Sequence, residues 1–329
     1  MIVRASAPCR LDFAGGWTDV EPYATDRGGA VVNAAIELRA TATVELDTAG
    51  YRLESLDLGT SATAADRSGL DVQSGLDLLR AAIRFTGAKP CRLVTESAAP
   101  PGSGLGSSGA MDVALVAALD HALGRSFSPL ETADRAWRVE AIEAGLPGGR
   151  QDQYAAALGG FHHFRFSGNT VTARPLALGG DLLAWLESHL VVCYTGQSRV
   201  SGNTIARVMG KYRDGDSEVS AALDGLAEAA DRMAEALERG EVSAIGRWLS
   251  ANWHHQQRLD PVMSTPLMAR LEHAMASAGA LGGKAAGAGA GGSMFFIVGD
   301  DPAAAVTEAQ RLGVTVLPLT WATLGVRTW

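Results

Sequence analysis

Residues 100–109 (PPGSGLGSSG) have the residue types best suited to binding a phosphate group. Their glycines let the backbone pass close to a ligand and adopt positive φ angles. Ser107 and Ser108 stand where the apolar run 110–123 begins a predicted helix, in the place of its N-cap and first turn. The free N–H groups and the dipole of a helix start favour an anion. The segment therefore predicts a cradle for a nucleoside triphosphate.

Other glycine-rich motifs fit this loop less well. No Gly-Lys-Ser/Thr closes it, so it is not a Walker A loop. Gly104, Gly106 and Gly109 have the G-x-G-x-x-G spacing of dinucleotide-binding folds. However, two prolines precede the turn, and no acidic residue ends a second strand about 20 residues later. A nicotinamide dehydrogenase is therefore disfavoured, while a plain glycine turn that packs a helix onto a sheet stays open.

Further polar residues stand beside other glycine turns. Residues 7–19 carry Arg10 and end in Asp19, whose carboxylate can accept hydrogen bonds from hydroxyl groups. Asp152 follows a Gly-Gly-Arg-Gln run, and residues 282–292 form a second glycine-rich turn. These four segments have the composition of a site.

The elements that must position these segments are predicted as strands and helices without regular alternation. The predicted strands are residues 3–13, 30–36, 40–46, 91–96, 161–166, 190–195, 293–298 and 314–317. The predicted helices are residues 76–86, 110–123, 130–144, 217–239 and 303–312. This mixture is typical of the α+β class.

Composition indicates a globular protein of 329 residues, with 47% hydrophobic and 19% charged residues. The net charge of −8 and the lack of a Lys/Arg run argue against nucleic-acid binding. An anionic substrate must then be met by individual arginines. Cys9, Cys91 and Cys193 form no C-x-x-C pair, which predicts reduced thiols in a cytoplasmic protein. No run of 18 apolar residues and no signal-like start occur, so no membrane association is predicted.

Residues 7–19, 100–110 and 284–292 together resemble, in this order, the three signature segments of the GHMP kinases, a superfamily of small-molecule kinases. The chain is most similar to the branch that contains D-glycero-D-manno-heptose 7-phosphate kinase and L-fucokinase. The segments that suggest this branch are FAGGWTD at 13–19, QDQYAA at 151–156 and TGQSR at 195–199.

The resemblance implies a two-subdomain α+β fold. The expected N-terminal, ATP-binding subdomain covers residues 1–185 and resembles the second domain of ribosomal protein S5. The expected C-terminal subdomain covers residues 186–329 and is ferredoxin-like.

The resemblance also implies an ATP-dependent kinase that phosphorylates a sugar hydroxyl with Mg²⁺ as cofactor. Asp152 matches the catalytic aspartate, and Arg10 matches the arginine that stabilises its ionised form. Ser108 and Glu140 match the metal ligands, and Glu143 is expected to be solvated. Asp152 could instead cap a helix that begins at Gln153, although this leaves its polar neighbours unexplained.

The expected contacts of each substrate follow from the same resemblance. The residues expected to hold ATP are Pro101, Gly102, Ser103, Gly104, Leu105, Gly106, Ser107 and Ser108. The residues expected to bind the sugar are Arg10, Gly16, Trp17, Asp19, Asp152, Thr195 and Arg199. Asp19 could equally cap a turn, and Arg199 either holds a substrate phosphate or lies on the surface. Lys284 could contact phosphate, but a lysine beside a glycine turn is more often solvated.

The sequence departs from the branch at residues 254–258 (HHQQR), where a lysine pair is usual. If those lysines serve a sugar phosphate, their absence favours a sugar that is unphosphorylated or differently phosphorylated. The predicted reaction is transfer to the anomeric hydroxyl of a heptose 7-phosphate. The alternatives are a kinase of a free sugar such as L-fucose, and a silent sugar and nucleotide sensor that the intact Asp152, Ser108 and Glu140 disfavour.

Overall fold

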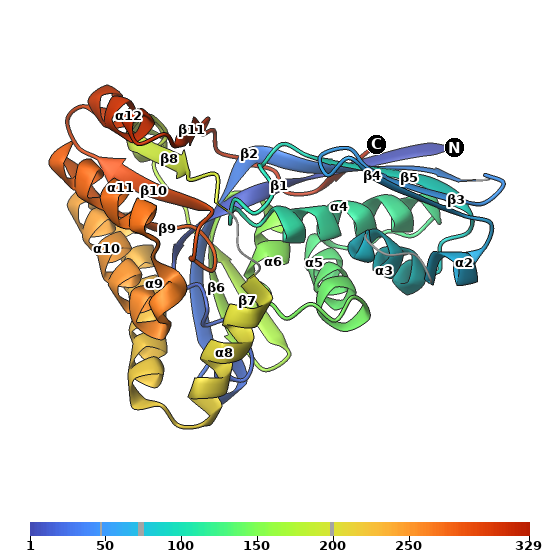
Figure 1. Cartoon of the computed structure of the whole chain (residues 1–329), viewed down its shortest axis with the longest axis horizontal. Helices are drawn as coiled ribbons and strands as arrows, with labels where there is room; N and C mark the ends of the chain where they lie inside the picture. Colours follow the sequence, from blue (N-terminus) through green and yellow to red (C-terminus); the bar gives the residue numbers. More distant parts are fainter. Residues whose placement is uncertain (47, 72–75, 198–200) are drawn as a thin grey trace.

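The computed structural model describes residues 1–46, 48–71, 76–197 and 201–329 (Figure 1). The larger of its two sheets contains β1 (Ile2–Ala14), β2 (Gly29–Leu46), β3 (Tyr51–Ser55), β4 (Thr60–Ala64), β5 (Cys91–Ser97), β6 (Phe161–Ser167), β7 (Thr170–Pro175) and β12 (Arg327–Thr328). The strand order is β12-β1-β2-β5-β3-β4, and β6 and β7 join it through β2.

The prediction of separate strands at 30–36 and 40–46 is wrong, because β2 runs unbroken over 18 residues. Its first part pairs with β6 and its second part pairs with β5. Residues 29–36 are buried throughout, whereas residues 37–46 alternate between more and less exposed positions. The burial pattern thus changes where the partner strand changes. In the sequence, this change resembles a break between two strands.

Helices cover one face of the larger sheet (Figure 1). The helical segments of this half are α1 (Tyr23–Asp26), α2 (Arg67–Asp71), α3 (Asp77–Thr86), α4 (Ser107–Ala122), α5 (Pro129–Arg138), the π-helical turn η1 (Val139–Glu143) and α6 (Gln151–Leu158). The central helix is α4, which packs on β1 and β2 and has Val113, Leu115, Val116 and Leu119 fully buried. Each such side chain contributes roughly 1.5–3 kcal/mol through burial.

The smaller sheet is antiparallel and lies beside the helices of the C-terminal half (Figure 1). Its strands, in spatial order, are β11 (Thr315–Leu317), β8 (Leu190–Tyr194), β10 (Ser293–Val298) and β9 (Ala280–Ala285). The helical segments are α7 (Gly180–His189), α8 (Ser201–Arg213), α9 (Ser217–Arg239), α10 (Val242–Leu259), η2 (Pro261–Met263), α11 (Pro266–Ser277) and α12 (Pro302–Arg311).

The mixed α+β architecture agrees with the prediction, whereas several elements were not predicted. The unpredicted helices of eight or more residues are α6, α7, α8, α10 and α11, and the unpredicted strands are β3, β4, β7, β9 and β12. The predicted helix at 130–144 is α5 continued by the π turn η1. Hydrophobic periodicity at 3.6 residues per turn does not distinguish such a π turn from α-helix.

The two ends of the chain lie side by side at one edge of the larger sheet (Figure 1). Thr328 of β12 pairs with Ala5 of β1, and the main chains of Arg4 and Trp329 exchange hydrogen bonds of 2.9 Å. The last residues of the sequence therefore complete the N-terminal sheet. The subdomain boundary at residue 185, which lies within α7, stays a prediction.

The three cysteines are buried and unpaired. Burial raises the pKa of Cys9 to about 12, that of Cys91 to about 11 and that of Cys193 to about 12. These thiols therefore stay protonated at neutral pH. Among the helices of the described residues, none has the length and apolarity that crossing a bilayer requires.

Candidate active site

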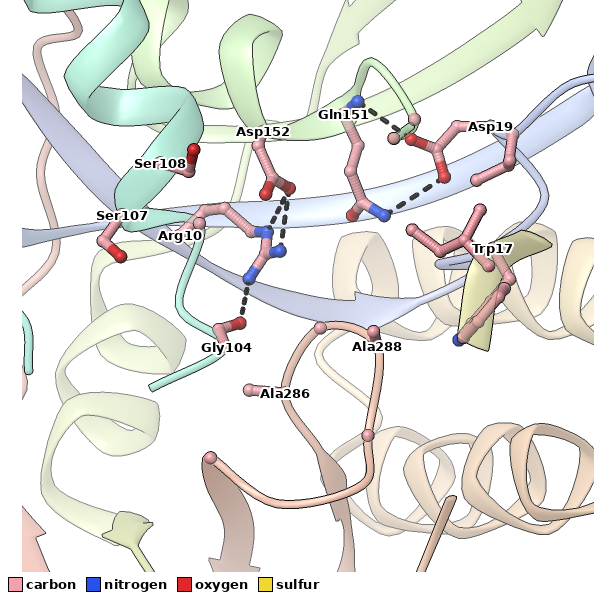
Figure 2. Close-up of a pocket in the computed structure, with 18 of the residues that line it drawn as sticks. Arg10, Trp17, Asp19, Gly104, Ser107, Ser108, Gln151, Asp152, Ala286 and Ala288 are labelled. Carbon is pink, nitrogen blue, oxygen red and sulfur yellow. Dashed lines mark hydrogen bonds and ion pairs between the residues drawn. The ribbon is translucent and has the colours of Figure 1, made fainter. Parts of the chain in front are cut away.

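A pocket of about 290 Å³ lies where the glycine-rich segments meet (Figure 2). It is lined by Arg10, Trp17, Asp19, Val20, Gly102, Gly104, Gly106, Ser107, Ser108, Glu140, Pro147, Gly148, Gly149, Gln151, Asp152, Ile205, Ala286, Gly287, Ala288, Gly289, Gly291 and Gly292. The structure thus brings together parts of all four segments that the sequence singled out.

The predicted phosphate loop ends at the start of α4. Gly104 and Gly106 have φ angles of 76° and 73°, and a Cβ on Gly104 would lie 2.7 Å from the carbonyl oxygen of Ala286. Gly106, not a serine, is the N-cap of α4, and Ser107 and Ser108 occupy its first turn. Because no side chain caps the helix, its first N–H groups remain available to an anion.

Arg10 and Asp152 form an ion pair at the centre of the pocket (Figure 2). Nε and Nη2 of Arg10 lie 2.8 and 2.7 Å from Oδ1 of Asp152, and Nη1 donates to the carbonyl oxygen of Gly104 at 2.6 Å. Burial opposes the charge of Arg10, but Asp152 and then Asp12 raise its pKa above the ordinary value. Asp152 makes no capping hydrogen bond in α6, so the alternative of a mere helix cap is not supported.

Glu140 lies directly against Ser108 in the pocket lining. The Ser108 hydroxyl donates to Oε1 of Glu140 at 2.7 Å, and the amide of Gln153 donates to Oε2 at 2.6 Å. Burial raises the pKa of Glu140, the hydrogen bond from Ser108 opposes this, and the charge of Asp152 adds to it. Glu143 is exposed, as predicted. The π turn η1 contains both acids and leaves Glu140 as the one in contact with Ser108.

Asp19 is buried at the first turn of α6 (Figure 2). Its carboxylate accepts hydrogen bonds from the main-chain N–H of Gln151 at 3.0 Å and from its side-chain amide at 3.2 Å. A Cβ on Gly149 would lie 1.9 Å from Oδ2 of Asp19, so glycine permits this approach. Burial raises the pKa of Asp19 to about 6, the main-chain hydrogen bond opposes the rise, and the charges of Asp152 and Asp12 add to it.

Two more residues of the first glycine segment have constrained positions. Trp17 is buried, lines the pocket and has a φ of 84°, which non-glycine residues seldom adopt. Gly16 lies behind the pocket, because a Cβ there would stand 2.1 Å from Oδ2 of Asp12. The sugar contacts of Trp17 and Gly16 stay predictions. Trp17 lines the pocket, whereas Gly16 is not among the lining residues and packs closely on Asp12.

Several predicted site residues lie outside this pocket lining. Ser103 and Leu105 are fully buried, and the carbonyl oxygen of Pro101 accepts a hydrogen bond from Tyr194 at 3.2 Å. Thr195 donates its hydroxyl to the carbonyl oxygen of Gly292 at 2.7 Å, so the geometry gives it a structural contact. The predicted sugar contact of Thr195 stays a prediction that this hydrogen bond does not favour. Arg199 lies outside the described residues.

The sequence analysis did not predict the buried residues that support the segments lining the pocket. Asn252 accepts a hydrogen bond from the main-chain N–H of Gly15 at 2.8 Å, and Gln256 donates to the carbonyl oxygen of Gly287 at 2.9 Å. Lys284, which was expected to be solvated, is fully buried and pairs with Asp12. A buried lysine requires a specific partner, which no local pattern reveals.

Comparison with known proteins identifies the family. Residues 72–160 match the model described as "GHMP kinases N terminal domain", and residues 233–313 match "GHMP kinases C terminal". D-glycero-alpha-D-manno-heptose 7-phosphate kinase of Campylobacter jejuni is 31% identical over 305 residues, which covers 90% of this chain and 89% of that protein. The chain belongs to the GHMP kinases.

Other relatives of this GHMP kinase fall in the predicted branch. The bifunctional fucokinase/GDP-fucose pyrophosphorylase of Arabidopsis thaliana is 29% identical over 329 residues, covering 94% of this chain and 31% of that longer protein. The crystal structure of a D-glycero-D-manno-heptose 1-phosphate kinase from Bacteroides thetaiotaomicron has a TM-score of 0.80 at 27% identity, covering 99% of this chain and 98% of that one. The predicted family and fold are confirmed. As a GHMP kinase, this protein is an ATP-dependent phosphotransferase.

Proposed function

We propose that this kinase transfers the γ-phosphoryl group of ATP to the anomeric hydroxyl of a heptose 7-phosphate. The observation that carries the proposal is the Arg10–Asp152 pair, which faces both the phosphate loop and the sugar-side residue Asp19 within one pocket. The 31% identity to a heptose 7-phosphate kinase supports the choice of sugar.

Asp152 is suited to act as the general base. The hydroxyl oxygen of the sugar forms a bond to the γ-phosphorus, the bond from that phosphorus to ADP breaks, and the hydroxyl proton passes to Asp152. Arg10 orients Asp152 through contacts of 2.7 and 2.8 Å. Gly104 accepts the remaining hydrogen bond of Arg10, which ties the base to the phosphate loop.

Ser108 and Glu140 are proposed to hold Mg²⁺. Their oxygens already lie 2.7 Å apart, and one hydroxyl with one carboxylate is the sparse set of protein oxygens that Mg²⁺ accepts beside nucleotide phosphates. The bound ion would supply charge neutralisation at the transferred phosphoryl group. Gln153 holds the second oxygen of Glu140 and so fixes its orientation.

Arg199 is proposed to hold the 7-phosphate of the substrate. Among the described lining residues, Arg10 is the cation, and its guanidinium is already engaged by Asp152 and Gly104. A second cation is therefore needed for a phosphorylated sugar, and Arg199 follows β8 closely in the chain. The alternative acceptor, a free sugar such as L-fucose, is favoured by the similarity to fucokinases and by the missing lysine pair.

An ATP-consumption screen tests the acceptor and the base together. Heptose 7-phosphates, free heptoses, L-fucose, mannose and galactose are compared at matched concentrations. For the preferred sugar, Asp152→Asn is expected to lower kcat by about 10²–10⁴-fold, the usual contribution of a general base. Asp181→Asn, at an exposed position of α7, is the matched control.

Two results would contradict the proposal. Retention of turnover within a few-fold in Asp152→Asn would exclude its role as base. A preference for free heptose or L-fucose over the 7-phosphate would replace the proposed acceptor, and Arg199→Met would then leave KM unchanged. With the 7-phosphate as acceptor, Arg199→Met is expected to raise KM by about 10-fold or more through loss of a charged hydrogen bond.

A cytoplasmic location is also proposed, because the three buried thiols form no disulfide.

A further inference from the structure

A buried ion pair joins the two sheets directly behind the pocket. Nζ of Lys284 in β9 donates to the carbonyl oxygen of Asp12 in β1 at 2.6 Å and lies 3.1 Å from its Oδ2. Both side chains are at most 1% exposed. The register of β1 shifts between Asp12 and Ala14, so this carbonyl lies at a bulge, where the hydrogen-bond ladder is locally disrupted. Lys284 supplies a donor at that point.

The same two strands lead into two different segments of the pocket lining. Asp12 precedes the turn at residues 15–19, which we call the sugar turn, and Lys284 precedes residues 286–292, which we call the third loop. Helix α10 contacts both segments, since Asn252 accepts from the sugar turn at 2.8 Å and Gln256 donates to the third loop at 2.9 Å. These two side chains are one helical turn apart and almost fully buried.

The third loop in turn packs against the phosphate loop through main-chain atoms. A Cβ on Gly287 would lie 2.7 Å from the carbonyl oxygen of Gly104. Directly after the third loop, the main-chain N–H of Ser293, the first residue of β10, donates to the carbonyl oxygen of Ser103 at 2.8 Å. Backbone atoms in direct contact cannot move closer together. The position of the third loop therefore determines that of the phosphate loop.

We propose that Lys284 is a positioning residue that fixes the separation between the sugar turn and the phosphate loop. The inference rests on the proposed sugar-kinase function and extends it, because in-line transfer requires the sugar hydroxyl and the γ-phosphorus to be held in register. Lys284 is fully buried and is not among the residues that line the pocket. It acts through Asp12 on one segment and through the third loop on the other.

The pair also sets the charge balance beneath the sugar turn. Burial is the main cause of the raised pKa of Asp19, and the charges of Asp152 and then Asp12 add to it. Arg10 and Lys284 are the cations that the described structure places against those two carboxylates. Because Lys284 lies against Asp12, removing its ammonium group changes the charge that acts on Asp19.

Lys284→Met tests the proposal with a side chain of similar length and no charge. We expect kcat for the preferred sugar to fall by about 10–100-fold, because a displacement of about 1 Å can cost that much in alignment. The affinity for a fluorescent ATP analogue is expected to change less than about threefold. A fall in kcat with nearly unchanged nucleotide affinity is the result that distinguishes a positioning role from a general loss of structure.

Hydrogen exchange provides a readout that does not depend on which sugar is phosphorylated. In Lys284→Met, faster exchange is expected in residues 12–19 and 285–292, with little change in α4 or in the rest of the larger sheet. Lys211→Met, which removes a half-buried lysine 3.8 Å from Asp260, is the matched control and is expected to leave both readouts unchanged.

The double variant Asp12→Asn/Lys284→Met separates positioning from stability, because it leaves no unpaired buried charge. The proposal predicts a Tm close to wild type and a kcat that remains low. Recovery of wild-type kcat in the double variant, or native exchange with native kcat in Lys284→Met, would overturn it. If no sugar in the screen is phosphorylated, the proposed function fails, and the exchange experiment alone then decides the role of Lys284.

Discussion

At the scale of single residues, the carboxylates of the pocket differ in their surroundings and therefore in what they can do. Asp152 is paired with Arg10 and is 28% exposed, which suits a base that must reach a ligand. Asp19 is buried without a cation among its described partners, and its pKa is about 6. Asp112, fully buried on α4, has its pKa raised well above the ordinary value, first by burial and then by Glu140. These differences in exposure and in partners support the proposed role of Asp152, and the proposed roles of both aspartates stay predictions.

Asp19→Asn is expected to lower kcat/KM for the sugar by about 10–100-fold at pH 8, because a charged acceptor for hydroxyl groups is lost. In the wild type, kcat/KM is expected to fall as the pH drops through about 6, where Asp19 becomes protonated. The acid limb of the pH–rate profile is measured with and without the substitution. An acid limb that stays near pH 6 in Asp19→Asn would assign that titration to another group.

Asp19→Asn is expected to stabilise the folded protein at pH 8, although it lowers kcat/KM. The folded-state pKa of Asp19, about 6, lies above its ordinary value of 3.8. Its contribution to stability is therefore full below pH 3.8 and is lost as the pH rises through 6. Asp19→Asn is expected to raise Tm at pH 8 and to lose this advantage near pH 4. Asp300→Asn, at an exposed position after β10, is the control and should change neither quantity.

At the scale of elements, the local motifs were predictable from the sequence and their distant partners were not. Residues 100–109 gave a correct strand–loop–helix order, because glycine spacing and a helix start are local signals. The burial of Lys284 depends on Asp12, which lies 272 positions away. The π turn at η1 and the continuous β2 were also missed, since both depend on which neighbour the segment packs against.

Gly104→Ala is expected to raise KM for ATP by about 10-fold or more. The added Cβ would lie 2.7 Å from the carbonyl oxygen of Ala286, so the phosphate loop and the third loop must separate. Gly87→Ala is the matched control, because Gly87 has a similar φ of 71° but open space around it. It should cost about 1 kcal/mol of stability and leave KM unchanged. Equal effects of both substitutions on KM would show that backbone strain, not the contact between loops, is responsible.

At the scale of the whole molecule, the chain end closes the larger sheet. Ala322 and Ala35 share a main-chain hydrogen bond of 2.9 Å, and Arg39 donates to the carbonyl oxygen of Gly325 at 2.6 Å. Residues 322–328 thus complete a structure that begins with β1. Hydrophobic periodicity predicted most of the long strands. It did not predict the pairing of the chain end with β1, because β12 has only two residues and is too short to show a pattern.

A fragment comprising residues 1–185 is therefore expected not to unfold cooperatively when produced alone. It lacks β12 and ends inside α7, so apolar surface of β1 and β2 would face water. Thermal melts followed by circular dichroism test this, with the full-length chain as the reference. A sharp transition in the fragment would show that the N-terminal half folds independently.

The inert native thiols make the molecule convenient for optical measurement. Because Cys9, Cys91 and Cys193 are buried and protonated, a maleimide dye is expected not to react with them while the protein stays folded. A cysteine introduced at an exposed position such as Leu56 would then be the single labelled point, with no native cysteine removed. Two cysteines introduced in this way would allow single-molecule fluorescence measurements on the protein during turnover.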